Sequence, residues 1–382
     1  MAEKTVILGT GLAGYTLARE LRKRDPQAEL LLISRDDGSS YSKPMLSNAL
    51  SKDKTADTLV MAAAEKAADD LNADIWTDTE VMQIDAARQQ LQSSRGAIDY
   101  HRLVLAHGAS PIKIPFAGDA ADHIMSVNSL ADYRIFRQAL HNRKRVVIIG
   151  AGLIGCEFAN DLTNIGISVD IVDLAPQALG RLLSQQAATE LQNRLQTAGV
   201  KWHLDNAVTS VNHAGQALHV DLKDGTRIET DIVLSAIGLR ANIKMATEAG
   251  IATERGIIVD RYLQTNQDGI FALGDCAQVE DLHLPFVMPL MNAARALAAT
   301  LTGEQTAVNY PAMPVVVKTP IYPIVVCPPP RPTHGEWHEE VSEDGIRARF
   351  QDEKGNLAGF VLTDGLVKER MAMAKEIKDW LV

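Results

Sequence analysis

The sequence predicts an α/β protein: two similar three-layer domains on parallel sheets, followed by a small C-terminal α+β domain. Three observations carry this prediction. An aliphatic strand followed by a glycine-rich turn and an amphipathic helix occurs twice, near residue 9 and near residue 150. Each copy is followed by short alternating strands and a returning aliphatic strand. After about residue 310 prolines become frequent, which marks a change of architecture. The length of 382 residues is typical of two or three domains.

The repeated unit has the pattern strand, GxGxxG, helix, second strand. Its first strand is residues 6–8 in one copy and 147–149 in the other, and its second strand is 30–33 and 169–172. In such a turn the first glycine permits the tight bend, the second admits a pyrophosphate, and the third lets helix and strand pack closely. Helix N-terminal amides then bind the phosphates. The six glycines are Gly9, Gly11 and Gly14 in the first copy, and Gly150, Gly152 and Gly155 in the second.

One such turn alone is weak evidence, but two copies, each between a predicted strand and helix, predict two Rossmann-like dinucleotide-binding units. Short strands are expected over residues 83–98 and 208–228. Returning strands over 103–105 and 233–235 each lead into Ala-x-Gly. A further strand over 270–273 leads into Gly274 and Asp275, and a helix is expected over 290–301. In the C-terminal region we expect strands at 346–350 and 359–362 and a helix over 367–381.

Composition excludes several functional classes. A net charge of −10 argues against general nucleic-acid binding and against attachment to an anionic membrane. No run of 18 apolar residues is present, so no membrane insertion and a cytoplasmic location are expected. Cys156, Cys276 and Cys327 are too few and too far apart for a disulfide scaffold, a CxxC redox pair or a metal site. We expect Cys156 and Cys276 to pack in the core.

The two glycine turns, the Ala-x-Gly returns and the late Gly-Asp-Cys-Ala resemble those of flavoprotein reductases with two dinucleotide-binding domains, related to glutathione reductase. Tyr41, Lys43 and Pro44 lie in a segment similar to one in the ferredoxin-reductase-like branch. The Val-Lys-Thr-Pro at residues 317–320 is most similar to that of rubredoxin and flavorubredoxin reductases. The resemblance covers essentially the whole chain.

The resemblance implies three domains. Residues 1–112 and 236–309 would form a discontinuous FAD-binding domain, residues 113–235 an NAD(H)-binding domain, and residues 310–382 the C-terminal domain. It also implies that the backbone at Val81 contacts adenine, that Asp275 binds the ribityl chain and that Val287 lies at the N1/O2 edge of the flavin. The residues expected to hold the FAD pyrophosphate are Gly9, Gly11, Leu12, Ala13 and Gly14.

The sequence departs from the family pattern at two positions. Ser34 and Arg35 stand where an acidic residue usually binds the adenosine ribose, and Asp36 and Asp37 follow them. His107 replaces the usual threonine of Ala-Thr-Gly, and we expect it to be a satisfied packing residue. A ribose contact from Ser34 or Arg35 is still expected.

Asp173 predicts which nicotinamide dinucleotide is used. It ends the second strand of the second unit, where a carboxylate accepts from the ribose 2′-hydroxyl and repels a 2′-phosphate. The residues after it, 174–177, contain no Arg or Lys for a phosphate. The sequence therefore predicts NADH rather than NADPH.

The resemblance also implies a route for electrons. Related enzymes use cysteines beside the flavin, but Ser42 and Lys43 occupy the loop concerned. Hydride would pass from NADH to FAD and single electrons would pass directly to the acceptor. Lys43 and Lys318 could stabilise negative charge on the flavin, and Glu157 would lie near the nicotinamide.

The implied acceptor is rubredoxin, in electron supply to alkane hydroxylation or to oxygen or peroxide detoxification. The alternatives are a [2Fe–2S] ferredoxin of an oxygenase system, and a flavin- and NADH-binding sensor. Because rubredoxins are acidic, local positive charge is required for docking. A monomer is expected. The basic residues available for docking are Lys43, Lys52, Lys54, Lys113, Lys318 and Arg331.

Overall fold

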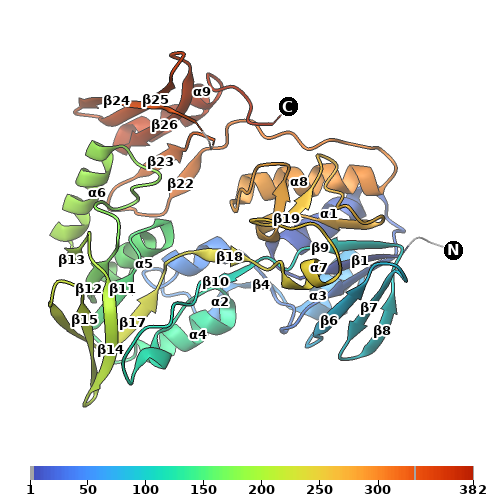
Figure 1. Ribbon diagram of the computed structural model, residues 1–382, viewed down its shortest axis with the longest axis horizontal. Coiled ribbons are helices and arrows are strands. Elements are labelled where there is room, and N and C mark those ends of the chain that lie inside the picture. Colours follow the sequence, from blue (N-terminus) through green and yellow to red (C-terminus); the bar gives the residue numbers. More distant parts are fainter. Residues whose placement is uncertain (1–3, 331–332, 382) are drawn as a thin grey trace.

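The computed structural model describes residues 4–330 and 333–381. Its N-terminal part is built on a parallel sheet of strand order β20-β9-β1-β2-β5 (Figure 1). The β1 strand is fully buried and aliphatic, as a central strand of a parallel sheet must be. The strands are β1 (Thr5–Leu8), β2 (Leu30–Ile33), β5 (Asp74–Trp76), β9 (Arg102–Leu105) and β20 (Ile270–Ala272).

Helices and an antiparallel meander share one hydrophobic core with this sheet. Helix α1 (Leu12–Arg24) packs against α8 (Val287–Leu301), and α3 (Ala64–Leu71) adds Ala67 and Leu71 to the core. The meander consists of β6 (Val81–Asp85), β7 (Gln90–Ser93) and β8 (Gly96–Asp99), whose apolar side chains face the same core.

A second parallel sheet repeats the plan, with order β13-β12-β11-β17. Its strands are β11 (Arg145–Ile149), β12 (Ser168–Val172), β13 (Val200–His203) and β17 (Ile232–Ser235). Its own meander is β14 (Val208–Ala214), β15 (Ala217–Leu222) and β16 (Arg227–Thr230). Its helices are α4 (Leu130–Ala139), α5 (Leu153–Asn164) and α6 (Gln185–Thr197).

A two-stranded antiparallel ribbon connects the two sheets (Figure 1). The chain leaves the first sheet through β10 (Ala109–Pro111) and returns from the second through β18 (Leu239–Ala241). The chain therefore passes from the first sheet to the second, and back again, through this ribbon.

The remaining elements are short. They are β3 (Ser40–Tyr41), β4 (Val60–Ala62), β19 (Ile257–Val259), β21 (Ala277–Val279), α2 (Ala56–Leu59), α7 (Lys244–Glu248) and the 3-10 turns η1 (Lys43–Asn48), η2 (Ala121–His123) and η3 (Gly274–Cys276). Across residues 4–330 and 333–381, none of the helices combines the length and apolar composition needed to cross a membrane.

The C-terminal part is an antiparallel sheet of order β22-β23-β26-β25-β24. The strands are β22 (Val315–Val317), β23 (Ile324–Cys327), β24 (Gly335–Ser342), β25 (Gly345–Asp352) and β26 (Leu357–Thr363). They are followed by the turn η4 (Asp364–Glu369) and helix α9 (Arg370–Ala374). The predicted α/β class with a small C-terminal α+β part is confirmed.

The predicted helix over residues 367–381 is wrong. Only Arg370–Ala374 is α-helical. The last residues leave the helix because their backbone pairs with Tyr310, whose carbonyl accepts hydrogen bonds from the amides of Trp380 (2.7 Å) and Leu381 (3.2 Å). Backbone pairing with a distant segment overrides the local amphipathic pattern.

Candidate functional site

A cavity of about 1270 Å³ opens at the carboxyl ends of the first sheet and extends to α5, the ribbon and β22. Carboxyl ends of parallel strands are where α/β proteins bind ligands. The predicted site residues that line it are Gly9, Gly11, Leu12, Ala13, Ser34, Arg35, Lys43, Val81, Glu157, Asp275, Val287 and Lys318. Gly14, Gly150, Gly152, Gly155 and Asp173 do not line this cavity.

The first glycine loop leaves an open helix N-terminus in the cavity wall. A Cβ at Gly9 or Gly14 would overlap neighbouring backbone, whereas one at Gly11 would meet open space. The first helix amides, at Leu12 and Ala13, have no hydrogen-bond partner within the described residues, and no side chain caps α1. This arrangement fits the phosphates of a dinucleotide.

The second loop has the same construction. Gly150 has a φ of +110° that glycine favours, a Cβ at Gly155 would overlap Gly150, and Gly152 faces open space. The carboxylate of Asp173 accepts hydrogen bonds from the amides of Ala151 (2.5 Å) and Ala175 (2.7 Å). The predicted acid thus lies directly beside the second glycine loop.

An acid that the sequence analysis did not single out stands near the first loop. The Ser34 hydroxyl receives a hydrogen bond from Thr10 (2.6 Å) and donates to the carboxylate of Asp36. Asp36 also accepts from the amide of Gly38 (3.0 Å) and lines the cavity. The Arg35 side chain is exposed. Asp36, three residues beyond the end of β2, therefore places a carboxylate beside Ser34. Its position in a run of two acidic residues was the available sequence signal.

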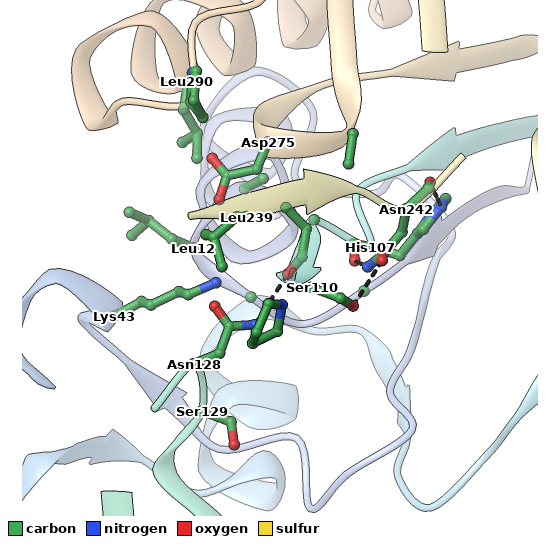
Figure 2. A pocket seen from close by; sticks show the side chains of 18 of the residues that line it. Leu12, Lys43, His107, Ser110, Asn128, Ser129, Leu239, Asn242, Asp275 and Leu290 are labelled. Carbon is green, nitrogen blue, oxygen red and sulfur yellow. Dashed lines mark hydrogen bonds between the residues drawn. The ribbon is translucent and has the colours of Figure 1, made fainter. Parts of the chain in front are cut away.

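Lys43 and Asp275 point into the same part of the cavity (Figure 2). Lys43 begins the η1 turn, and its ammonium forms no hydrogen bond or ion pair within residues 4–330 and 333–381. Burial lowers the pKa of Lys43, and the negative charges of Asp275 and Asp132 oppose that effect. A cation held here without a direct partner favours an anionic ligand.

Glu157 joins three parts of the chain. Its fully buried carboxylate on α5 accepts from the Lys318 ammonium (2.5 Å), the Lys318 amide (3.0 Å) and the Ser47 hydroxyl (2.5 Å). Ser47 lies in η1 and Lys318 directly follows β22. The structure thus brings the predicted residues Glu157 and Lys318 together as an ion pair, which sequence reasoning missed because they are remote in the chain.

Two more buried polar residues of α5 extend this junction. Asp161 accepts hydrogen bonds from the amides of Leu50 (2.8 Å) and Ser51 (3.0 Å) and from the Ser51 hydroxyl. Asn160 accepts from the amide of Ile321 (3.2 Å). One face of α5 therefore fixes both the segment after η1 and the start of the C-terminal sheet.

The structure corrects the expectation for His107 and confirms that for Cys156 and Cys276. His107 lines the cavity; its Nε2 is 2.7 Å from the Asn242 carbonyl oxygen, but its Nδ1 has no partner, so it is not fully satisfied. Cys156, Cys276 and Cys327 are buried free thiols outside the cavity lining, and burial raises the pKa of Cys276 to about 12.

The basic residues expected to dock an acidic partner differ in availability. Lys52, Lys54 and Lys113 are exposed, whereas Lys318 is paired with Glu157 and Lys43 lies in the cavity. Arg331 lies outside the described residues.

Comparison with known proteins gives consistent matches. Residues 3–299 match the family model "pyridine nucleotide-disulphide oxidoreductase", and residues 307–377 match "rubredoxin binding C-terminal domain". The chain is 46% identical to a rubredoxin-NAD(+) reductase of Alcanivorax borkumensis, covering 97% of this chain and 98% of the relative. It is 37% identical to a nitric oxide reductase FlRd-NAD(+) reductase of Vibrio vulnificus, covering 99% and 98%.

Solved structures of two reductases have the same fold as this chain. A ferredoxin reductase of the CYP199A2 system from Rhodopseudomonas palustris superimposes with a TM-score of 0.88 at 27% identity, covering 97% of this chain and 93% of that chain. A covalent putidaredoxin reductase–putidaredoxin complex gives a TM-score of 0.89 at 26% identity, covering 98% and 93%.

Proposed function

The chain belongs to the pyridine nucleotide-disulphide oxidoreductase family, and from this premise we propose that it is an NADH-dependent flavoprotein reductase that transfers electrons to rubredoxin. One observation carries the proposal beyond the match itself. A single cavity is lined by the first glycine loop, by α5 of the second unit and by β22 of the segment that matches a rubredoxin binding domain. Donor, cofactor and acceptor can therefore meet at one place.

FAD is the cofactor assigned to this cavity; when bound, it accepts a hydride from NADH and returns electrons singly. The loop residues Gly9 to Gly14 would hold its pyrophosphate through open amides. Asp36 with Ser34 would bind the adenosine ribose. Asp275 would bind the ribityl chain, and the backbone at Val81 and Val287 would contact its two ring systems. Residues 1–112 and 236–309 would form this domain, with residues 310–382 as the C-terminal domain.

NADH would bind on the second unit, residues 113–235. Gly150, Gly152 and Gly155 would admit its pyrophosphate to the N-terminus of α5. Asp173 would accept from the adenosine 2′-hydroxyl while its two backbone hydrogen bonds hold it in place. A fixed carboxylate at this position repels a 2′-phosphate, which supports NADH over NADPH.

The charged residues would act electrostatically rather than by proton transfer. Lys43 carries an unpaired positive charge in the cavity and would stabilise negative charge acquired there. Lys318 is held by Glu157 at the junction with the C-terminal sheet, so its charge is largely neutralised by its partner. No cysteine lines the cavity within the described residues, so we assign no thiol relay.

A second candidate is reduction of a [2Fe–2S] ferredoxin in an oxygenase system. It is favoured by the similarity in fold to a ferredoxin reductase, at a lower identity than the rubredoxin reductase relatives. With rubredoxin as acceptor, the electrons would serve alkane hydroxylation or oxygen and peroxide detoxification. We assign the protein to the cytoplasm, as a monomer.

Anaerobic stopped-flow absorbance tests the proposal. We expect NADH to bleach the flavin band of the purified protein, and oxidised rubredoxin, added next, to restore it. Reoxidation by ferredoxin alone would select the second candidate. A protein that binds no flavin, or whose flavin ignores NADH, would refute both.

A further inference from the structure

His107 and Asn242 hydrogen-bond to each other across the two chain segments that connect the parallel sheets. We call these two residues and their hydrogen bonds the clamp. His107 is the second residue after the returning strand β9, and Asn242 directly follows β18; Figure 2 labels both side chains. The Asn242 carbonyl oxygen lies 2.7 Å from His107 Nε2, and the Asn242 side-chain amide donates to the His107 carbonyl (2.8 Å). The side chain of each residue is therefore hydrogen-bonded to the backbone carbonyl of the other.

Two further hydrogen bonds complete this clamp. The Asn242 amide donates to the Gly108 carbonyl (3.0 Å), and the Ser110 hydroxyl donates to Asn242 Oδ1 (2.7 Å). Asn242 thus forms four hydrogen bonds to three residues of the opposite crossing. Next to the clamp, Asn128 donates to the Ala109 carbonyl (3.0 Å), which ties the ribbon to the segment before α4 of the second unit.

The geometry fixes the chemical state of His107. A carbonyl oxygen only accepts, so Nε2 must carry the proton and Nδ1 must be the bare nitrogen. Nδ1 has no hydrogen-bond partner and is shielded from solvent, so protonating it would create an unpaired buried charge. In agreement, burial lowers the pKa of His107. Among the described residues, the His107 ring is therefore a neutral donor that hydrogen-bonds to Asn242 alone.

The clamp lies in the cavity wall, against the first glycine loop. A Cβ on Gly9 of the first loop would contact the Cα of His107, so the clamp abuts that loop directly. His107, Ser110, Asn128 and Asn242 all line the cavity. Any change in the angle of the ribbon would move the second unit relative to the first loop.

We propose that His107 and Asn242 are positioning residues that set the orientation of the second unit over the cavity, and thereby the alignment of donor and acceptor during hydride transfer. This inference rests on the proposed function. A misalignment of about 1 Å can slow a reaction about 100-fold. The adenosine half of NADH would bind at the second loop, away from the clamp, so the rate of transfer should suffer more than the affinity.

The test compares His107→Leu, which cannot donate, with His107→Gln, whose amide can replace Nε2 as a donor to Asn242. Single-turnover reduction by NADH gives the limiting rate and the Kd separately. We expect His107→Leu to lower the limiting rate at least about tenfold with the Kd of NADH changed less than about twofold, and His107→Gln to recover most of the rate. Hydrogen exchange of residues 106–112 and 238–243 in the flavin-free protein should increase in His107→Leu only.

Two further variants keep the test decisive. Ser110→Ala removes an outer bond of the clamp at an exposed residue, and should give a smaller loss in the same direction. Thr230→Val removes a buried hydroxyl that donates to the Arg145 and Ile232 carbonyls (both 3.1 Å), outside the cavity lining, and should leave the limiting rate unchanged.

An unchanged limiting rate in His107→Leu would overturn the inference, as would equal losses in His107→Gln or in Thr230→Val. If the wild-type protein itself takes up no flavin or is not reduced by NADH, the proposed function fails instead. The exchange measurement needs no cofactor and still reports whether His107 holds the ribbon.

Discussion

Lys43 is half-buried, and its ammonium points into the cavity without a hydrogen-bond or ion-pair partner in the described part of the chain. An unpaired charge in such a place costs stability, and residues that cost stability are often retained for function. Its lowered pKa has the same origin: burial disfavours the charged form.

We expect Lys43→Met to stabilise the flavin-free protein and to impair the loaded one. The midpoint of urea unfolding should rise because the desolvated ammonium is gone. The reduction potential of the bound flavin should fall because negative charge loses its stabilising cation. Dye-equilibrated titration measures the potential, and Lys66→Met, which removes an exposed lysine of α3, is the control. An unchanged potential would contradict the role of Lys43.

The Glu157–Lys318 pair predicts a different pattern. Removing Lys318 leaves a fully buried carboxylate without its cation, so Lys318→Met should cost about 3 kcal/mol of unfolding free energy. The double variant E157Q/K318M leaves no buried charge and should recover most of that loss. Urea unfolding of K318M, E157Q and the double variant checks this, and losses that add in the double variant would show that the pair is not coupled.

Asp173→Ala tests the dinucleotide preference. We expect a higher KM for NADH and a smaller ratio of NADH to NADPH efficiency, because the carboxylate that would repel a 2′-phosphate is removed. Steady-state kinetics with both dinucleotides measure the ratio. Asp170→Ala, on the same strand but paired with His203, is the control. An unchanged ratio would show that another group selects the dinucleotide.

At the scale of elements, α5 determines how the parts of the site meet. Glu157, Asn160 and Asp161 are buried and polar on one helix, and each bonds a segment distant in sequence. Asp161 alone holds two backbone amides of the segment that follows η1.

Asp161→Ala should therefore release that segment. The stranded amides of Leu50 and Ser51 would cost about 1–3 kcal/mol, and the exposed bonds after Lys52 and Lys54 should become more susceptible to trypsin. Mass spectrometry of timed digests follows the cleavage. Asp57→Ala, which breaks only an exposed ion pair with Arg134, should leave the cleavage rate unchanged. Equal protection in both variants would contradict the role of Asp161.

Elements governed by local pattern were predictable, and those governed by distant partners were not. The strands and glycine turns of both parallel sheets follow from aliphatic runs and from positive-φ positions such as Gly9 and Gly150. The helix expected at 367–381 failed because Tyr310 binds its last residues. Sequence spacing alone does not reveal contacts between distant segments, such as the ion pair of Glu157 with Lys318. It also does not reveal that Ser34 donates a hydrogen bond to Asp36.

At the scale of the whole molecule, the negative net charge of the protein opposes its association with an acidic electron acceptor. A chain of charge −10 must approach an acidic partner, so exposed lysines near the cavity should matter more than the total charge. Lys52 and Lys54 follow the η1 turn and are exposed. Lys43, in contrast, points into the cavity, and Lys318 is paired with Glu157.

The rate of rubredoxin reduction should fall as ionic strength rises, because salt screens this attraction. The double charge reversal K52E/K54E should lower the rate at low salt and flatten its salt dependence. K201E/K223E, on β13 and on the turn after β15, is the matched control. Stopped-flow reduction of rubredoxin over a salt series measures both effects. A flat wild-type dependence would rule out electrostatic docking.

The two ends of the segment that carries the C-terminal sheet are hydrogen-bonded to each other: the amide of Tyr310 donates to the Leu381 carbonyl (2.9 Å), and the Leu381 amide donates to the Tyr310 carbonyl (3.2 Å). The two ends of this segment are therefore fixed to each other, and Lys318 fixes the segment to Glu157 of the second unit as well. Because Lys318 also lines the cavity, exchanging the whole segment would remove one partner of the buried ion pair together with the sheet. Grafting the corresponding segment of a ferredoxin reductase between these two residues, with Lys318 retained, would test whether this segment selects the electron acceptor.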